Sequence, residues 1–388
     1  MKRRIGKPQR GFTLLELMIA SAVGLVVIAA MTSLFKIGMD ATFTVTQRAE
    51  TQQNMRAAVE LMTQDISLAG SGLPSGGLQL VTGGTVSKFG CNQTGTCYVP
   101  AGTYPASGGG VPNFMYGIIP GFNTGVQAGA VITAAPGQVN DSITSIYCDY
   151  NFPLSNFNFT FPGGPTQATV TVINAGVQPN NILAAGGLNP GDLILFTVST
   201  PGNGNGNNGT SLIQNAAVVA EVTTIPNNTT INFASGDALN MNQTGAGTSN
   251  NLSTVIASSG AGTQMSACRL YAVSYFLQVP VAGGTVETPR LMRQVNGQNA
   301  IPVADNIINL QFTYDIFDSV AGTITANSAN PLPAGLSPAL IQKVNLWVMG
   351  QGLTTAGRKA QSMYLATSVA ARNMSFCNSY SSSTTVCQ

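Results

Sequence analysis

The sequence has 388 residues, enough for one large folded domain or two smaller ones. Only 30 side chains are Lys, Arg, Asp or Glu and 44% of the residues are hydrophobic, which excludes the highly charged, apolar-poor composition of disordered proteins. The sequence contains no histidine, so the usual general base and the commonest zinc ligand are missing. No basic patch stands out, and composition therefore gives nucleic-acid binding little support.

The N-terminus joins a basic leader to a long apolar segment. Residues 1–10 carry five basic side chains and no acidic one, and residues 12–35 form a 24-residue apolar run. A helix of that length reaches about 36 Å, enough to cross a bilayer core of about 30 Å. The basic flank is expected to stay cytoplasmic, which places the chain after Lys36 in the periplasm or outside the cell.

Glu16 is the one charge within this apolar run. A lone carboxylate in a membrane segment is expensive, so it needs either a partner or a wet position at the interface. The residues alone leave both interpretations open.

The segment KPQRGFTLLELMIA, residues 7–20, resembles the class III signal of type IV prepilins and pseudopilins. In that family a prepilin peptidase cuts after the glycine and methylates the new N-terminal amine. The resemblance implies cleavage between Gly11 and Phe12, N-methylation of Phe12, and an assembly role for Glu16. In the family this carboxylate neutralises the terminal ammonium of a neighbouring subunit, and two opposite charges in an apolar filament core are tolerable only together.

One long helix is expected from residue 12 to about residue 69, because no proline occurs between Pro8 and Pro74. Residues 12–35 form its transmembrane and assembly half, and residues 36–70 form its amphipathic half. The helix is predicted to end at the segment that begins with Gly70. An apolar stripe with 4-3-4-3 spacing near the end is expected to pack on the protein's own sheet. The stripe comprises Met55, Val59, Met62, Ile66 and Ala69.

Residues 71–388 are expected to form a β-rich globular domain with long polar loops, because Gly, Asn, Thr, Ser and Val are abundant there. The predicted fold class is therefore α+β, with the long N-terminal helix packed on an antiparallel sheet. Residues 201–210 and 236–263 are predicted to be loops. The predicted strands are Ser142–Asp149, Asp192–Ser199, Ala216–Ile225, Leu270–Val279, Asn306–Phe317, Gln342–Gly350 and Met363–Arg372.

Six cysteines all lie beyond the N-terminal helix, and their even number in an exported domain predicts disulfides. Six cysteines allow 15 pairings, and the alternative of some free buried thiols stays open. Proximity in sequence favours Cys91–Cys97 and Cys377–Cys387, which leaves Cys148–Cys268. None of the cysteines forms a CxxC pair, so a zinc site is not expected. We also expect no other metal site and no cofactor.

A looser resemblance extends from residue 12 to about residue 375. The helix end QNMRAAVELMTQDISLAG, residues 53–70, and the order of later segments such as YAVSYFLQV and KVNLWVMGQG resemble PilW-type minor pilins. This resemblance implies a minor pilin that acts in initiation, in assembly or at the tip of a type IV pilus, with links to motility and adhesion. The J-type pseudopilin of type II secretion is the alternative.

The resemblance also implies partners and a location. The partners are the prepilin peptidase, other minor and major pilins through the N-terminal helix, the inner-membrane assembly platform and inner-membrane lipid. The expected location is the inner membrane in a single pass, with the N-terminus cytoplasmic and the C-terminal domain periplasmic, and then the pilus at the cell surface.

Two sequence patterns could indicate an enzyme or a ligand-binding site. Residues 204–209 match GxGxxG, but the following residues read as a strand, whereas a dinucleotide site needs a helix. Asp315 and Asp318 lie three apart and allow a carboxylate pair or a calcium ligand pair, although a solvated strand end is favoured. With no histidine and no nucleophile motif, we expect no enzyme. A membrane-anchored hydrolase is set aside, and a pilus-tip adhesin remains an alternative.

Overall fold

The computed structural model describes a chain of two compact units, residues 1–50 and residues 51–388. The described part of the first unit is helical from Leu14 onward, and the second unit contains the end of this helix and the antiparallel sheets. The described residues are 11–74, 77–84, 114–122, 140–174, 176–201, 212–258, 264–278, 281–282, 285–286, 289–318, 322–328, 332, 336–352 and 361–374.

The long helix α1 spans Leu14–Leu68, close to the predicted range. It begins two residues later than predicted because Thr13 caps it. It ends just before Gly70, whose φ of +81° lies in the left-handed region that glycine adopts without strain. The Gly70 N–H then donates to the Ile146 carbonyl at 2.8 Å. The predicted stop is therefore confirmed.

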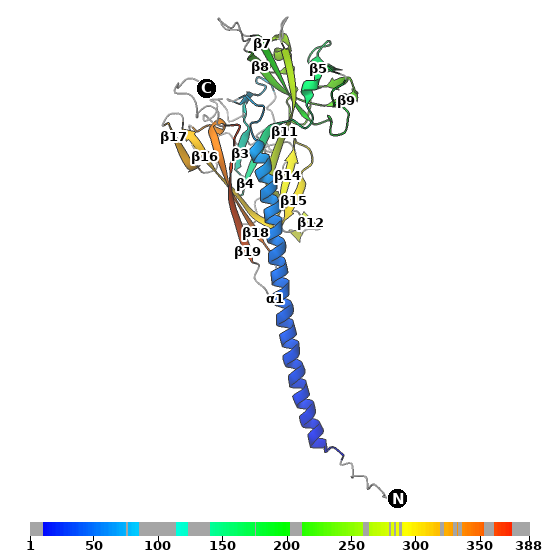
Figure 1. Ribbon diagram of the computed structural model, residues 1–388, viewed down its shortest axis with the longest axis vertical. Helices are drawn as coiled ribbons and strands as arrows, with labels where there is room; N and C mark the ends of the chain where they lie inside the picture. Colours follow the sequence, from blue (N-terminus) through cyan, green and yellow to red (C-terminus); the bar gives the residue numbers. More distant parts are fainter. Residues whose placement is uncertain are drawn as a thin grey trace. The chain divides into compact units, whose positions relative to one another are not determined.

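Three antiparallel sheets make up most of the second unit (Figure 1). The largest has the order β15-β14-β11-β4-β3, and the long strand β11 also pairs with β7, which pairs with β8. These strands are β3 (Ile118–Phe122), β4 (Asp141–Asp149), β7 (Leu193–Pro201), β8 (Leu212–Glu221), β11 (Gln264–Gln278), β14 (Arg290–Val295) and β15 (Ile301–Asp305).

The two other sheets have four strands each. One has the order β17-β16-β18-β19 and the other β5-β6-β10-β9. The first consists of β16 (Ile307–Asp318), β17 (Thr323–Ser328), β18 (Ile341–Gln351) and β19 (Ser362–Ala370). The second consists of β5 (Phe157–Thr160), β6 (Gln167–Val172), β9 (Thr224–Asn227) and β10 (Thr230–Asn232).

Short elements complete the described part of the fold. Two-residue strands form the pairs β1 with β2 and β12 with β13. These are β1 (Leu78–Gln79), β2 (Phe114–Met115), β12 (Val281–Ala282) and β13 (Thr285–Val286), and the short helices are η1 (Leu154–Asn156), α2 (Leu252–Ser258) and η2 (Pro338–Leu340).

The apolar stripe at the end of α1 lies in the main core of the second unit. All five predicted stripe residues are buried, and Met62, Ile66 and Ala69 have no exposed surface. They join one cluster with side chains of the largest sheet and of the β17-β16-β18-β19 sheet. The prediction that the stripe packs on the protein's own sheet is confirmed.

A second core lies between the β5-β6-β10-β9 sheet, the β7-β8 pair and α2. Its centre is aromatic: Phe196 packs edge-on against Phe159 and Phe233, with ring centroids 5.4 and 5.7 Å apart. Such aromatic pairs add stability beyond the area they bury.

All seven predicted strand regions contain strands, but two details of the prediction were wrong. The predicted strand Ala216–Ile225 is split, because β8 ends at Glu221 and β9 begins at Thr224. The predicted loop 236–263 contains the helix α2, whose Leu252 and Val255 are buried in the second core.

Candidate processing and assembly segment

The start of α1 is held by three reciprocal hydrogen bonds between Thr13 and Glu16. The Thr13 N–H and hydroxyl both donate to Glu16 Oε2 at 3.0 Å, and the Glu16 N–H donates to Thr13 Oγ1 at 3.3 Å. This is a capping box, in which the first and fourth residues satisfy amides that a helix start leaves unpaired. The spacing Thr-x-x-Glu was a readable signal for it that the sequence interpretation did not use.

The predicted cleavage point lies immediately before this cap. Gly11 and Phe12 precede the helix, and the Phe12 side chain is 89% exposed. A Cβ atom placed on Gly11 would meet nothing within 4 Å. Packing among the described residues therefore does not require a glycine at this position. A processing enzyme that recognises the glycine would supply such a requirement.

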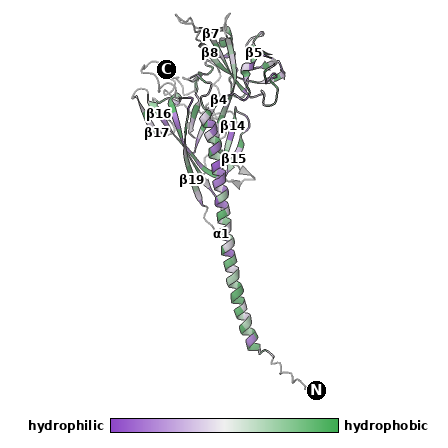
Figure 2. Ribbon diagram, in the orientation of Figure 1, coloured by the Kyte–Doolittle hydropathy of each residue, from purple (hydrophilic) through white to green (hydrophobic). Residues whose placement is uncertain are grey.

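The first part of α1 is apolar on all sides. Its hydrophobic colouring in Figure 2 extends along this stretch, and Leu14, Leu25 and Phe35 are 77, 68 and 70% exposed. By length and composition α1 can cross a membrane, and its most apolar stretch is not buried within the chain. A helix that is hydrophobic all round needs an apolar surrounding, either lipid or other helices. This feature suggests a membrane anchor.

Comparison with known proteins agrees with the geometry of this segment. The prokaryotic N-terminal methylation motif matches residues 6–32, which contain Gly11, Phe12, Glu16 and most of the apolar run. Motif and helix together indicate a type IV pilin-like protein. No curated protein and no solved structure matches this pilin-like chain. The motif implies processing by a prepilin peptidase and assembly with other pilins.

Asp65 joins the end of α1 to the largest sheet. The Tyr147 hydroxyl donates to Asp65 Oδ1 at 2.7 Å, the Tyr275 hydroxyl donates to Oδ2, and Arg293 Nε lies 3.0 Å from Oδ2. Burial raises the pKa of both tyrosines, and the nearby Asp65 charge raises it further, so both hydroxyls stay protonated and can donate. Asp65 is only 4% exposed. The sequence interpretation missed it, although it lies three residues after Met62 on the stripe's face.

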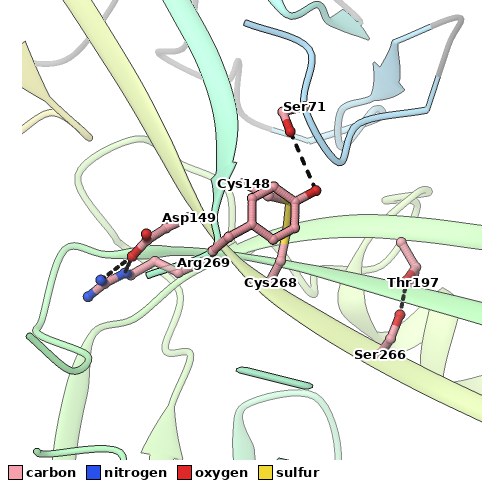
Figure 3. Close-up of a disulfide and its surroundings, with 8 residues drawn as sticks. Ser71, Cys148, Asp149, Thr197, Ser266, Cys268 and Arg269 are labelled. Carbon is pink, nitrogen blue, oxygen red and sulfur yellow. Dashed lines mark hydrogen bonds and ion pairs between the residues drawn. A yellow bond between two sulfur atoms is a disulfide. The ribbon is translucent and has the colours of Figure 1, made fainter. Parts of the chain in front are cut away.

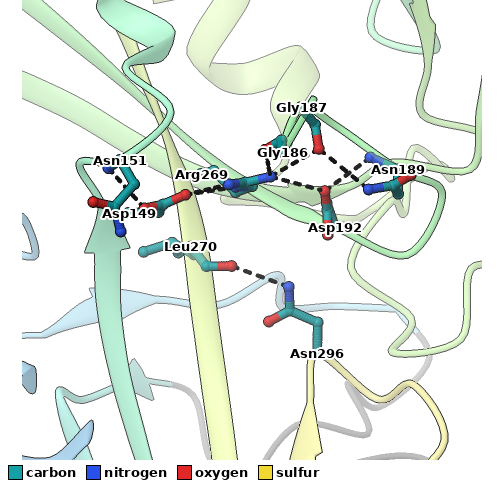
Figure 4. Close-up of polar contacts among 9 residues, drawn as sticks. All are labelled: Asp149, Asn151, Gly186, Gly187, Asn189, Asp192, Arg269, Leu270 and Asn296. Atoms are coloured by element: carbon teal, nitrogen blue, oxygen red, sulfur yellow. Dashed lines mark hydrogen bonds and ion pairs between the residues drawn. The ribbon is translucent and has the colours of Figure 1, made fainter. Parts of the chain in front are cut away.

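Arg269 of β11 is at the centre of a second buried cluster (Figure 4). Its Nε donates to Asp149 Oδ2 at 3.0 Å, and its Nη1 donates to the carbonyls of Gly186 and Gly187 at 2.8 Å. Asp192 Oδ2 lies 3.8 Å from Nη1. The guanidinium thus connects β11 to β4 and to the loop before β7, a structural role that the sequence interpretation did not foresee.

A disulfide joins β4 to β11 close to this cluster (Figure 3). Cys148 and Cys268 are bonded, with Cα atoms 5.8 Å apart and a sequence separation of 120. This pairing agrees with the predicted one. Cys91, Cys97, Cys377 and Cys387 lie outside the described residues, so Cys91–Cys97 and Cys377–Cys387 stay predictions.

Asp315 is not the solvated strand end that the sequence favoured. It is half-buried in β16, where its carboxylate pairs with Lys343 at 2.6 Å and accepts from the Asn327 N–H and the Asn345 amide at 2.9 Å each. Burial opposes ionisation, but these bonds outweigh it and lower the pKa of Asp315. The side chain of Asp318 lies outside the described part of the structure.

The GxGxxG match, residues 204–209, also lies outside the described residues. The strands on either side of it are described: β7 and β8 pair antiparallel, from Leu193 with Glu221 to Pro201 with Leu212. The segment after the match is therefore a strand, as predicted, and the helix that a dinucleotide site needs is replaced by β8.

Glu221 gives the domain a predicted pH dependence. It is 4% exposed beside Asp237, and burial raises its pKa from 4.5 to about 7. The N–H groups of Leu239 and Ala238 oppose this shift, and the Asp237 charge adds to it. The folded state thus keeps a proton on Glu221 that the unfolded state releases above pH 4.5. The contribution of this proton to the stability of the folded state is fully present below pH 4.5 and is lost as the pH rises through about 7.

We expect the free energy of unfolding to decrease by an amount on the order of 2 kcal/mol when the pH is raised from 5 to 8. The urea concentration at the midpoint of unfolding should decrease accordingly. Fluorescence of Trp347, the one tryptophan in the sequence, reports unfolding. Glu221→Gln keeps an acceptor for the N–H groups but cannot ionise, so its midpoint should vary less with pH. An equal slope in both proteins would contradict the assignment. Burial also raises the pKa of Asp192. In Glu221→Gln, Asp192 should therefore leave a smaller decrease of stability with rising pH.

Proposed function

We propose that the chain is a minor pilin of a type IV pilus that acts in initiation, in assembly or at the tip of the filament. The observation that carries the proposal is the methylation motif placed directly at the capped start of an all-round apolar helix. A filament subunit needs this arrangement, because its helix must leave the bilayer and pack among other apolar helices.

The capping box makes the proposed role of Glu16 chemically specific. Its bonds to Thr13 use Oε2, so Oε1 can accept from an ammonium group. Cleavage before Phe12 would create such an ammonium in every subunit. In a filament core, the Phe12 amine of one subunit and the Glu16 carboxylate of its neighbour would neutralise each other, which removes the cost of burying either charge alone.

The proposed location follows from the charge pattern. The basic leader stays cytoplasmic, α1 is held in the inner membrane, and the disulfide-bonded domain lies in the periplasm before it reaches the pilus. The partners would be the prepilin peptidase, the assembly platform and other pilins. A J-like pseudopilin of a type II secretion system is the second candidate, favoured by the same motif. We propose no enzymatic activity.

Processing at Gly11 is the first test. We expect cleavage between Gly11 and Phe12, leaving residues 12–388 with an N-methylated Phe12, and N-terminal mass spectrometry measures this directly. Gly11 substituted by valine should leave the uncleaved precursor in the membrane. Since that substitution meets no steric hindrance among the residues that the structure describes, the loss would reflect the peptidase and not misfolding. A mature terminus at another residue would contradict the assignment.

Deleting the gene tests the role in assembly. We expect fewer surface pili by electron microscopy, restored by the wild-type gene supplied in trans. Normal pili together with lost type II secretion would favour the pseudopilin, and normal pili with lost adhesion would favour an adhesin.

A further inference from the structure

The outer face of the β17-β16-β18-β19 sheet carries a shallow groove. In β18, Val344, Leu346 and Val348 are buried in the main core, and the residues between them are half-exposed. Because side chains alternate along a strand, Asn345 and Trp347 lie on the opposite face, where they line the groove.

Neutral hydrogen-bonding groups form most of the groove lining. Gln311, Asn327 and Asn345 contribute side-chain amides, and Thr313 and Ser368 contribute hydroxyls. Among the described residues that line it, none carries a charge.

The polar groups on the floor of the groove are fixed in place. Asn345 Nδ2 donates to Asp315 Oδ1 at 2.9 Å and to Asn327 Oδ1 at 3.1 Å, and Lys343 pairs with the other Asp315 oxygen at 2.6 Å. Both amide hydrogens of Asn345 are therefore used, and its carbonyl oxygen is left to accept from a ligand. The charges of Lys343 and Asp315 neutralise each other. The network therefore presents fixed polar atoms to the groove without adding a net charge. Such preorganisation reduces the entropy lost on binding.

An aromatic platform lies beside these groups. Trp347 stacks on Tyr364 of β19, with ring centroids 6.3 Å apart and planes 26° from parallel. The Tyr364 side chain is 73% exposed. The groove thus places a flat apolar surface next to amide and hydroxyl groups.

We propose that this groove binds a neutral glycan. A sugar ring has one face of C–H groups, which packs on an aromatic ring, and a rim of hydroxyls, which pair with amides and hydroxyls. Other ligand classes fit less well. Nucleic acid requires basic side chains for its phosphates, and an apolar peptide segment would leave the amides of the groove without partners. The inference is independent of the proposed role in pilus assembly.

The test is titration of the full-length chain with neutral oligosaccharides. The protein is kept in a zwitterionic detergent, since a sugar-headed detergent would compete. The probes are the hexasaccharides of maltose, cellulose, chitin and β-mannan type, and heparin is the anionic control. Because Trp347 is the one tryptophan in the sequence, its fluorescence reports occupancy of the groove directly. We expect a saturable change with at least one neutral sugar and none with heparin.

Variants then locate the binding by calorimetry. Trp347→Ala should weaken it about tenfold or more, and Trp347→Phe, which keeps an aromatic face, should retain most of it. Ala366 is exposed and pairs with Trp347 across the sheet, so Ala366→Arg should block the groove without removing core packing. Ile324→Ala, exposed on the same sheet but outside the groove, is the matched control. Melting by circular dichroism checks each fold.

Binding that survives in folded Trp347→Ala and Ala366→Arg proteins would overturn the proposal. So would the absence of binding to all four neutral sugars, or binding to heparin alone.

Discussion

Glu16→Gln is expected to insert, to be cleaved and to fail to enter pili. Glutamine can keep the capping box with Thr13, because it also accepts from the Thr13 N–H and hydroxyl. It cannot neutralise the Phe12 ammonium of a neighbouring subunit. Incorporation into sheared pili should therefore fall roughly tenfold or more, as for Glu16→Ala, since each leaves a buried charge without its partner. Immunoblots of membrane and sheared-pilus fractions measure this.

Thr13→Ala is the matched control for the capping role. It removes the threonine hydroxyl from the box but keeps the Glu16 charge, so the variant should still enter pili. Three outcomes are then distinct. If Glu16→Gln and Glu16→Ala both fail to enter pili, assembly requires the charge of Glu16. If Glu16→Ala fails and Glu16→Gln assembles, assembly requires the helix cap. If Glu16→Ala assembles like the wild type, the carboxylate is only a wet interfacial residue and the proposed pairing is wrong.

The N-terminal segment was predictable because its determinants are local. Gly11, Phe12 and Glu16 lie within six consecutive residues, and the apolar run needs no partner in the domain to be recognised. The end of α1 was equally readable, because a 4-3-4-3 apolar stripe followed by Gly70 specifies both a packed face and a stop. The length of the apolar run, the spacing of the stripe and the position of Gly70 can all be recognised from residues that are close together in the sequence.

The polar anchors of the domain could not be predicted in this way. Asp65 meets its partners at sequence separations of 82, 210 and 228 residues, and Arg269 meets Asp149 across 120. No periodicity links such positions, since they become neighbours only once the sheet has formed. The groove around Trp347 is hidden for the same reason: its residues come from four strands, and register alone brings them together. The Cys148–Cys268 pair was predicted only because the other cysteines had closer partners in sequence.

Asp65→Ala is expected to lower the free energy of unfolding by about 3–5 kcal/mol, because it leaves the half-buried Arg293 charge and two buried tyrosine hydroxyls without their acceptor. Asp65→Asn should cost less, since its amide oxygen still accepts from one of the tyrosines. The urea midpoint of the full-length chain, followed by Trp347 fluorescence, measures both. The end of α1 depends on this carboxylate, so we also expect the Ala variant to expose residues 51–68 to limited proteolysis.

Asp305→Ala is the control that separates burial from ion pairing as such. Asp305 pairs with Arg290 at 3.0 Å, the same distance as Asp65 and Arg293, but the two side chains are 60 and 40% exposed. Exposed pairs contribute about 0–1 kcal/mol, so the midpoint should barely move. A double variant, Asp65→Leu with Arg293→Met, removes both charges and should recover part of the loss, because apolar groups can replace a buried pair at little cost. If Asp65→Ala and Asp305→Ala destabilise equally, the buried cluster is not what holds α1 to the sheet.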